Sequence, residues 1–292
     1  MGDERAAGDG TSIDTAAWRG RLSTGWLSQA SRLEAMLAPV DDPLLASAAP
    51  ALAESVLDVG CGRGVTARRV AELVGVDGRV VGVDVSVDTI AAAGSIDAAP
   101  DSAPIEWIAA DAAALSLDRP VDLVVSRFGV MFFDDPVAAF TNLRTVTRPE
   151  GRLAVAVWLP RTQSEFQRRS LDTAVAAAHR LGVHLHLPDP VSGPFRYGDR
   201  EWFTGVLEDA GWRQVGWEPC ELHLHVGGPG TSAAEAAALG MANGPLAMLT
   251  GGLEDDLRRE IEHEVAVDLE RAWDGTGVRL AAGIAVVTAR HM

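Results

Sequence analysis

Three acids and a glycine-rich turn are the residues of this sequence best suited to act together in chemistry. The segment SVLDVGCGRG (55–64) joins an apolar run containing Asp58 to glycines on alternate positions. Two more acids, Asp84 and Asp111, each follow another apolar run. A carboxylate at the end of a strand can accept hydrogen bonds from the hydroxyls of a ribose. The pattern therefore indicates a nucleotide-binding site.

The turn and the overall composition narrow the kind of nucleotide. A dinucleotide fingerprint needs G-x-G-x-x-G, but its third glycine position is Val65 here, which disfavours an NAD-linked oxidoreductase. The sequence contains no lysine, so a P-loop lysine and Schiff-base chemistry are both excluded. Three acids without such a lysine favour an adenosine that carries a positive sulfonium over one that carries phosphates.

The elements that must position these acids alternate along the first half of the chain. Strands are expected over 55–59, 79–84, 104–111, 121–128 and 151–158, with helices over 63–75, 86–94 and 136–148. Continuous apolar strands separated by helices are typical of a parallel sheet covered on both faces. We therefore predict an α/β fold of the doubly wound, Rossmann-like type, with further strands over 212–226 and 279–290.

Charge and composition exclude several classes of function. The net charge is −16, whereas a nucleic-acid binder normally carries a basic stripe. No segment approaches the ~18 apolar residues of a membrane span, and MGDERAAGDG has no secretory pattern. Cys61 and Cys220 are too few for a disulfide framework. We expect a cytoplasmic protein without nucleic-acid partners or membrane insertion; no feature indicates its oligomeric state.

The order of the motifs resembles the class I S-adenosylmethionine-dependent methyltransferases. VLDVGCGRG (56–64) is similar to their glycine motif, VVGVDVS (80–86) to the ribose motif and AADAAAL (109–115) to the adenine motif. The region 121–158 resembles a bacterial subgroup related to quinone-biosynthesis C-methyltransferases. The resemblance implies S-adenosylmethionine as cofactor, S-adenosylhomocysteine as product, and a seven-stranded sheet whose last strand is antiparallel.

The same resemblance implies roles for individual residues. Those near the methionine half of the cofactor would be Asp58, Gly60, Cys61 and Gly62. Those near its ribose and adenine would be Asp84, Val85, Asp111 and Ala112. Those beneath the sulfonium would be Ser126 and Arg127. We expect a helical lid over 1–50, a cofactor-binding core over 51–160, and the rest of the sheet with cap segments over 161–292 (about 161–198 and 228–278).

The methyl acceptor is expected to be a small molecule. VVSRFGVMFF (124–133) lacks both the Asn/Asp-Pro-Pro-aromatic run of enzymes that methylate base amines and the acids of the metal-dependent catechol type. We therefore expect C- or O-methylation of a small hydrophobic or aromatic metabolite from secondary or quinone-type metabolism. Aromatic residues of an apolar pocket would wall the acceptor and attract the sulfonium: Trp26, Phe128, Phe132 and Trp158.

Candidate general bases lie in the predicted cap and in the late strand. Glu165 follows the fifth strand, His186 lies in VHLHLP, and His223 lies in CELHLHV. If these last two stretches are strands, the two alternating histidines of each stretch point to one face of the sheet. Such a pair would provide a general base, bind zinc, or form a polar strand face. Two alternatives stay open. Glu165 and nearby arginines would suit methylation of a prenyl diphosphate carbon, and a non-catalytic scaffold would only bind the cofactor.

Overall fold

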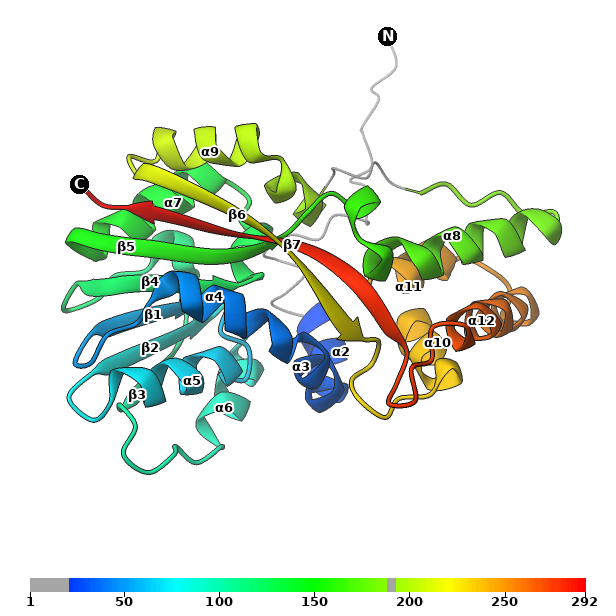
Figure 1. Ribbon diagram of the computed structural model, residues 1–292, viewed down its shortest axis with the longest axis horizontal. Helices are drawn as coiled ribbons and strands as arrows, with labels where there is room; N and C mark the ends of the chain where they lie inside the picture. Colours follow the sequence, from blue (N-terminus) through cyan, green and yellow to red (C-terminus); the bar gives the residue numbers. More distant parts are fainter. Residues whose placement is uncertain (1–20, 188–192) are drawn as a thin grey trace, which may run out of the picture.

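The computed structural model describes residues 21–187 and 193–292, which form a seven-stranded sheet flanked by helices (Figure 1). The strands lie in the order β3-β2-β1-β4-β5-β7-β6. Their bounds are β1 Ser55–Val59, β2 Arg79–Asp84, β3 Ile105–Ala109, β4 Val121–Arg127, β5 Thr147–Trp158, β6 Arg213–His225 and β7 Arg279–Arg290. β7 is antiparallel to both of its neighbours, whereas β1 to β5 pair in parallel. This topology confirms the predicted Rossmann-like sheet and its antiparallel last strand.

Helices cover both faces of the sheet. α4 (Asp41–Ala48) and α5 (Val65–Val74) lie on one face, and α7 (Pro136–Thr145) and α9 (Arg200–Asp209) lie on the other (Figure 1). α5 begins directly after the glycine turn, and its apolar residues recur at helical spacing, so that one face is buried against the sheet. α6 (Val87–Gly94) follows β2 and is capped by Ser86, whose hydroxyl accepts from the Thr89 N–H.

Of the strand boundaries that differ from the predicted ones, two have clear local reasons. β4 ends at Arg127 because Phe128 has a φ of 67°, a left-handed conformation that leaves the strand. β5 begins at Thr147 rather than at residue 151. Its pairing with β4 shifts register between Val121 and Leu123, where the Pro149–Gly151 segment interrupts the regular ladder. The Pro-containing start of β5 thus joins the sheet through an irregularity.

A second group of helices packs together at the carboxyl end of the sheet. α8 (Glu165–Arg180), α10 (Ala233–Ala242), α11 (Gly244–Thr250) and α12 (Asp255–Glu270) share a separate hydrophobic core. The buried stripe of α12 consists of Ile261, Val265 and Leu269, at the spacing of one helical turn. This helical group occupies the region predicted to form the cap.

The predicted lid corresponds in part to α2 (Arg21–Ser28), α3 (Ala30–Leu37) and the short 3₁₀ helix η1 (Ala38–Val40). Residues 1–20 of the predicted lid and 188–192 of the predicted cap lie outside the described residues. α3 reaches the helical group through the Arg32–Glu235 ion pair at 3.0 Å. Among the described helices, none combines the length and apolar character that crossing a bilayer needs.

Candidate cofactor and acceptor site

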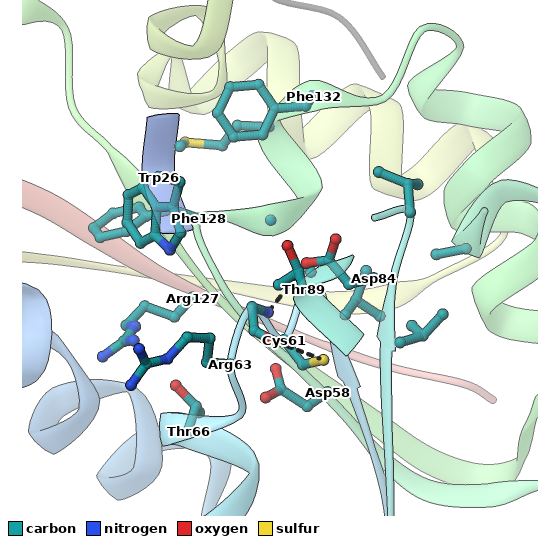
Figure 2. A pocket seen from close by; sticks show the side chains of 18 of the residues that line it. Trp26, Asp58, Cys61, Arg63, Thr66, Asp84, Thr89, Arg127, Phe128 and Phe132 are labelled. Atoms are coloured by element: carbon teal, nitrogen blue, oxygen red, sulfur yellow. Dashed lines mark hydrogen bonds between the residues drawn. The ribbon is translucent and has the colours of Figure 1, made fainter. Parts of the chain in front are cut away.

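A cavity opens at the carboxyl ends of β1, β2 and β4, beneath α2 and α3 (Figure 2). This is the edge of a doubly wound sheet where ligands usually bind. The predicted cofactor and acceptor residues that line it are Asp58, Gly60, Cys61, Gly62, Asp84, Val85, Asp111, Ala112, Arg127, Trp26, Phe128, Phe132 and Trp158. The structure therefore brings both predicted sets into one cavity.

The glycine turn passes close to the η3 segment (Gly129–Phe132), which follows β4. A Cβ atom on Gly60 would lie 2.6 Å from the Gly129 Cα, and the φ of Gly60 is 66°. Both observations require glycine at this position. The Gly60 and Cys61 N–H groups donate to the Val83 carbonyl, which ties the turn to the end of β2.

Asp58 supplies a buried acid at the floor of the cavity, and one of its two carboxyl oxygens lacks a partner in the part of the chain that the structure describes. It is 1% exposed, and its Oδ2 atom has no hydrogen-bond partner among the described residues. Burial raises the pKa of Asp58 to about 7, although the charge of Arg127 opposes that rise. A buried carboxyl oxygen without a partner costs free energy unless a ligand satisfies it, so Asp58 fits a cationic or hydroxyl-bearing ligand.

Asp84 and Asp111 are held by backbone N–H groups around them. Asp84 Oδ2 accepts from the Gly62 N–H at 3.1 Å, and its Oδ1 accepts from the Ser86 N–H at 2.9 Å. Asp111 Oδ1 caps the short η2 helix (Ala112–Ala114) by accepting from the Ala113 N–H at 2.9 Å. Burial raises the pKa of Asp84, opposed by those N–H groups. Both carboxylates therefore present fixed oxygen atoms to the cavity.

Ser126 and Arg127, at the end of β4, have different surroundings. Ser126 does not appear among the cavity-lining residues; it is buried and donates to the Val59 carbonyl at 2.7 Å. Its hydroxyl also accepts from the Gly129 and Val130 N–H groups, which joins β1, β4 and η3. Arg127 lines the cavity and donates to Asp41 Oδ2 at 3.2 Å. Of the two, only Arg127 is in a position to meet a ligand.

An aromatic wall closes the cavity opposite the charged floor. The Phe128 and Trp158 rings stack with centroids 4.1 Å apart and planes 9° from parallel. Phe166 of α8 continues this stack, 5.8 Å from Trp158. Figure 2 shows Trp26, Phe128 and Phe132 at one end of the cavity, and Arg63, Arg127 and Asp58 toward the other. The cavity thus has a charged part and an apolar part.

Several lining residues carry no signal that we recognised in the sequence. Glu34 of α3 forms an ion pair with Arg63 of the glycine turn at 3.1 Å. Thr66 and Thr89, from the first turns of α5 and α6, also line the cavity. Their positions directly after the glycine motif and after the ribose motif are the signal that could have identified these threonines. The presence of Glu34 in the cavity depends on how the lid folds, so no local sequence pattern identifies it.

The structure does not bring the three candidate bases into the cavity. Glu165 begins α8 and pairs with Arg169 at 2.8 Å, which also binds Asp268 at 2.7 Å. His186 lies in a segment without regular structure, so the strand assumed for the alternating pair does not form there. His223 is exposed on β6. No cluster of potential metal ligands is found in residues 21–187 and 193–292.

The Cys61 thiol lines the cavity but is unsuited to act as a nucleophile or base. Burial raises its pKa well above the ordinary value, and the neighbouring charges of Asp58 and Asp84 add to that rise. The thiol therefore stays protonated and serves as a small apolar side chain between two glycines.

Comparison with known proteins identifies the family. A family model described as a methyltransferase domain matches residues 56–151. The uncharacterized methyltransferase Rv0089 of Mycobacterium tuberculosis is 33% identical over 155 residues, which cover 52% of this chain and 76% of that protein. A demethylmenaquinone methyltransferase of Corynebacterium kroppenstedtii is 26% identical over 177 residues, 58% of this chain and 72% of the relative.

The chain belongs to the methyltransferase family. This membership confirms the predicted class, that of the S-adenosylmethionine-dependent methyltransferases. An arsenite methyltransferase of Halobacterium salinarum is 34% identical over 112 residues, 38% of this chain, which spans only 29% of that protein. The fold also matches a solved structure, titled a putative methyltransferase from an antibiotic biosynthesis pathway of Anabaena variabilis. That match has a TM-score of 0.56 and 15% identity, and it covers 86% of this chain and 96% of the other.

Proposed function

We propose that this protein transfers the methyl group of S-adenosylmethionine to carbon or oxygen of a small hydrophobic or aromatic metabolite. The observation that carries the proposal is the single cavity in which strand-end acids face an aromatic wall. The acids suit a sulfonium nucleoside without phosphates, and the wall suits an apolar acceptor. The predicted place of the acceptor in secondary or quinone-type metabolism is part of the proposal.

The charged part of the cavity supports a particular orientation of the cofactor. Asp84 would accept from the ribose hydroxyls, because its carboxylate is already fixed by the Gly62 and Ser86 N–H groups. Asp111 and the adjacent Ala112 would meet the adenine. Asp58 would accept from the ammonium of the methionine half, which supplies the partner that its buried Oδ2 atom lacks.

The apolar part of the cavity supports the transfer itself. S-adenosylmethionine supplies a methyl group bound to a positive sulfonium, which makes it electrophilic. Trp26, Phe128 and Trp158 would exclude water and attract that positive charge through their ring faces. A transfer in line with the departing sulfur gains mainly from proximity and alignment. A protein base is needed only where the acceptor must lose a proton during attack.

The alternatives from the sequence receive less support. A prenyl diphosphate would need cations that face the acceptor. Arg168 instead pairs with Asp172, Arg169 pairs with Glu165 and Asp268, and neither of them lines the cavity. Arg63 and Arg127 do line it, but they lie in its charged part and are paired with Glu34 and Asp41. A non-catalytic scaffold would not need the aromatic wall beside the acids. The naming of one relative as a demethylmenaquinone methyltransferase supports a ring-bearing acceptor of the quinone type.

Calorimetric titration with S-adenosylhomocysteine and with NAD tests the cofactor part of the proposal. We expect micromolar or tighter binding of S-adenosylhomocysteine and none of NAD at the same concentrations. A folded sample that binds NAD, or that does not bind S-adenosylhomocysteine, would refute the cofactor part of the proposal.

Truncation of the aromatic wall tests the acceptor part. In Phe132→Ala, the KM for a turned-over acceptor should rise about tenfold, the scale of losing one buried aromatic side chain. The affinity for S-adenosylhomocysteine should change less than twofold. Phe195→Ala is the control, because Phe195 is a more deeply buried phenylalanine that does not line the cavity, so its loss perturbs packing without touching the acceptor site. Equal effects of the two variants on acceptor KM would remove the aromatic wall from the acceptor site.

A further inference from the structure

Two buried carboxylates, Asp41 and Asp58, lie near the Arg127 guanidinium at the floor of the cavity. Arg127 Nη1 donates to Asp41 Oδ2 at 3.2 Å and to the Leu37 carbonyl at 3.4 Å. The charge of Arg127 also acts on Asp58, whose pKa it lowers against the larger effect of burial. Asp58 Oδ2 nevertheless has no hydrogen-bond partner among the described residues. The guanidinium therefore pairs with Asp41 and makes no hydrogen bond to the Oδ2 atom of Asp58.

Asp41 is fixed in place by its surroundings. It lies at the start of α4 and is fully buried, at 0% exposure. Its Oδ1 accepts from the Thr66 hydroxyl at 2.8 Å, while its Oδ2 faces Arg127 and, at 3.8 Å, Arg69. A buried carboxylate that lost these partners would carry a large desolvation penalty. Asp41 is thus a rigid anion that can hold the Arg127 side chain.

We propose that Asp41 is a positioning residue that holds Arg127 away from Asp58, so that Asp58 stays available for the ammonium group of the cofactor. The inference rests on the proposed function, because it takes that ammonium as the ligand of Asp58. Without the Asp41 charge, the guanidinium is drawn to the other acids on which its charge acts, the fully buried Asp58 and the partly buried Glu34, and Glu34 is already paired with Arg63. An Arg127–Asp58 pair would then compete with the ligand for the same carboxylate.

Asp41→Asn tests this role with little change in side-chain volume. The amide can still accept from Thr66, but it does not hold a guanidinium by charge. We expect S-adenosylhomocysteine to bind about tenfold more weakly, near the lower end of what a hydrogen bond to a charged group contributes. The analogue of S-adenosylhomocysteine that lacks the amino group should bind wild type and variant equally. The ratio of the two dissociation constants is the readout, because a general loss of packing would weaken both ligands.

Asp42→Asn is the matched control. Asp42 is the next residue of the same helical turn, but it is exposed and pairs with Arg69 at 2.8 Å. Its replacement should leave both dissociation constants unchanged. Calorimetry is carried out on the full chain at a temperature where thermal unfolding shows each variant to be folded.

Arg127→Met provides a second arm that does not depend on the folding of Asp41→Asn. This variant removes the competitor for Asp58, so the preference for the amino-bearing ligand should persist. In the double variant, the Asp41→Asn change should cause no further loss of that preference. The inference is overturned if Asp41→Asn keeps the wild-type ratio, or if Arg127→Met alone abolishes it. Failure of wild type to bind S-adenosylhomocysteine would instead refute the proposed function.

Discussion

Replacement of Asp84 by alanine is the most informative single perturbation of the proposed cofactor site. The carboxylate accepts the Gly62 N–H on Oδ2 and the Ser86 N–H on Oδ1, and it lines the cavity, where its remaining lone pairs are available to a ligand. Two hydrogen bonds from ribose hydroxyls would use those lone pairs. The variant removes both of them and also the bond from the Gly62 N–H, while the Gly60 and Cys61 N–H groups still hold the glycine turn to the Val83 carbonyl.

The expected loss of binding free energy in Asp84→Ala follows from the negative charge on the Asp84 carboxylate, which accepts the hydrogen bonds. Hydrogen bonds to charged groups contribute about 1.5–3 kcal/mol each, and water satisfies part of the loss when the side chain is removed. We therefore expect roughly 2–3 kcal/mol in binding, which is a roughly 30- to 150-fold rise in the dissociation constant. Asp88→Ala is the matched control, because Asp88 is an exposed acid in the first turn of α6. It should leave the affinity within twofold of wild type.

Calorimetric titration with S-adenosylhomocysteine measures both variants. An analogue without the two ribose hydroxyls separates the direct contact from loosening of the turn. For that analogue, Asp84→Ala should cost far less affinity than it does for S-adenosylhomocysteine. An affinity of Asp84→Ala for S-adenosylhomocysteine within threefold of wild type would show that the ribose does not lie at Asp84.

Three further predictions concern other parts of the site. Because the folded-state pKa of Asp58 is about 7, above the unfolded value of about 3.9, the ligand-free protein should lose stability as pH rises through this window. Asp58→Asn should make that slope shallower in denaturant titrations between pH 4 and 7; part of it remains, because burial also raises the pKa of Glu34, Asp41 and Asp84, and a slope as steep as that of wild type would contradict the assignment. Gly60→Ala should cost about 1–2 kcal/mol more in unfolding free energy than Gly62→Ala. Both have positive φ, but only Gly60 meets backbone at 2.6 Å, and equal denaturation midpoints would refute the close approach. Glu165→Gln should leave kcat within twofold, because its carboxylate is paired with Arg169 outside the cavity, and a hundredfold loss would restore its role as a base.

The sheet and the charged part of the cavity could be predicted because their signals are local. Asp58, the glycines and Asp84 occupy two strand-to-helix connections, and the sequence of each connection determines its backbone. Parallel strands then bring those connections to the same edge of the sheet. The family resemblance implies a place for Ser126 beneath the sulfonium, but its hydroxyl instead joins β1 to η3.

The lid contacts could not be predicted because they join distant parts of the chain. Asp41 meets Thr66 across 25 residues and Arg127 across 86, and no local pattern specifies either pair. Polar and apolar residues alternate at 183–187, as they do in a strand. No strand forms there, because the segment has no strand partner. Glu165 follows β5 as expected, but the first turn of α8 directs its carboxylate to Arg169 one turn later.

Transfer of an isotope-labelled methyl group tests the central claim most directly. The purified full chain is incubated with methyl-labelled S-adenosylmethionine and a panel of hydroquinones, hydroxylated polycyclic aromatics and polar non-aromatic acceptors, and the products are analysed by mass spectrometry. We predict label on carbon or oxygen of a ring-bearing acceptor, with one S-adenosylhomocysteine released per methyl group and a rate reduced in Phe132→Ala. Label that reaches only polar acceptors, or transfer unaffected by Phe132→Ala, would contradict the account.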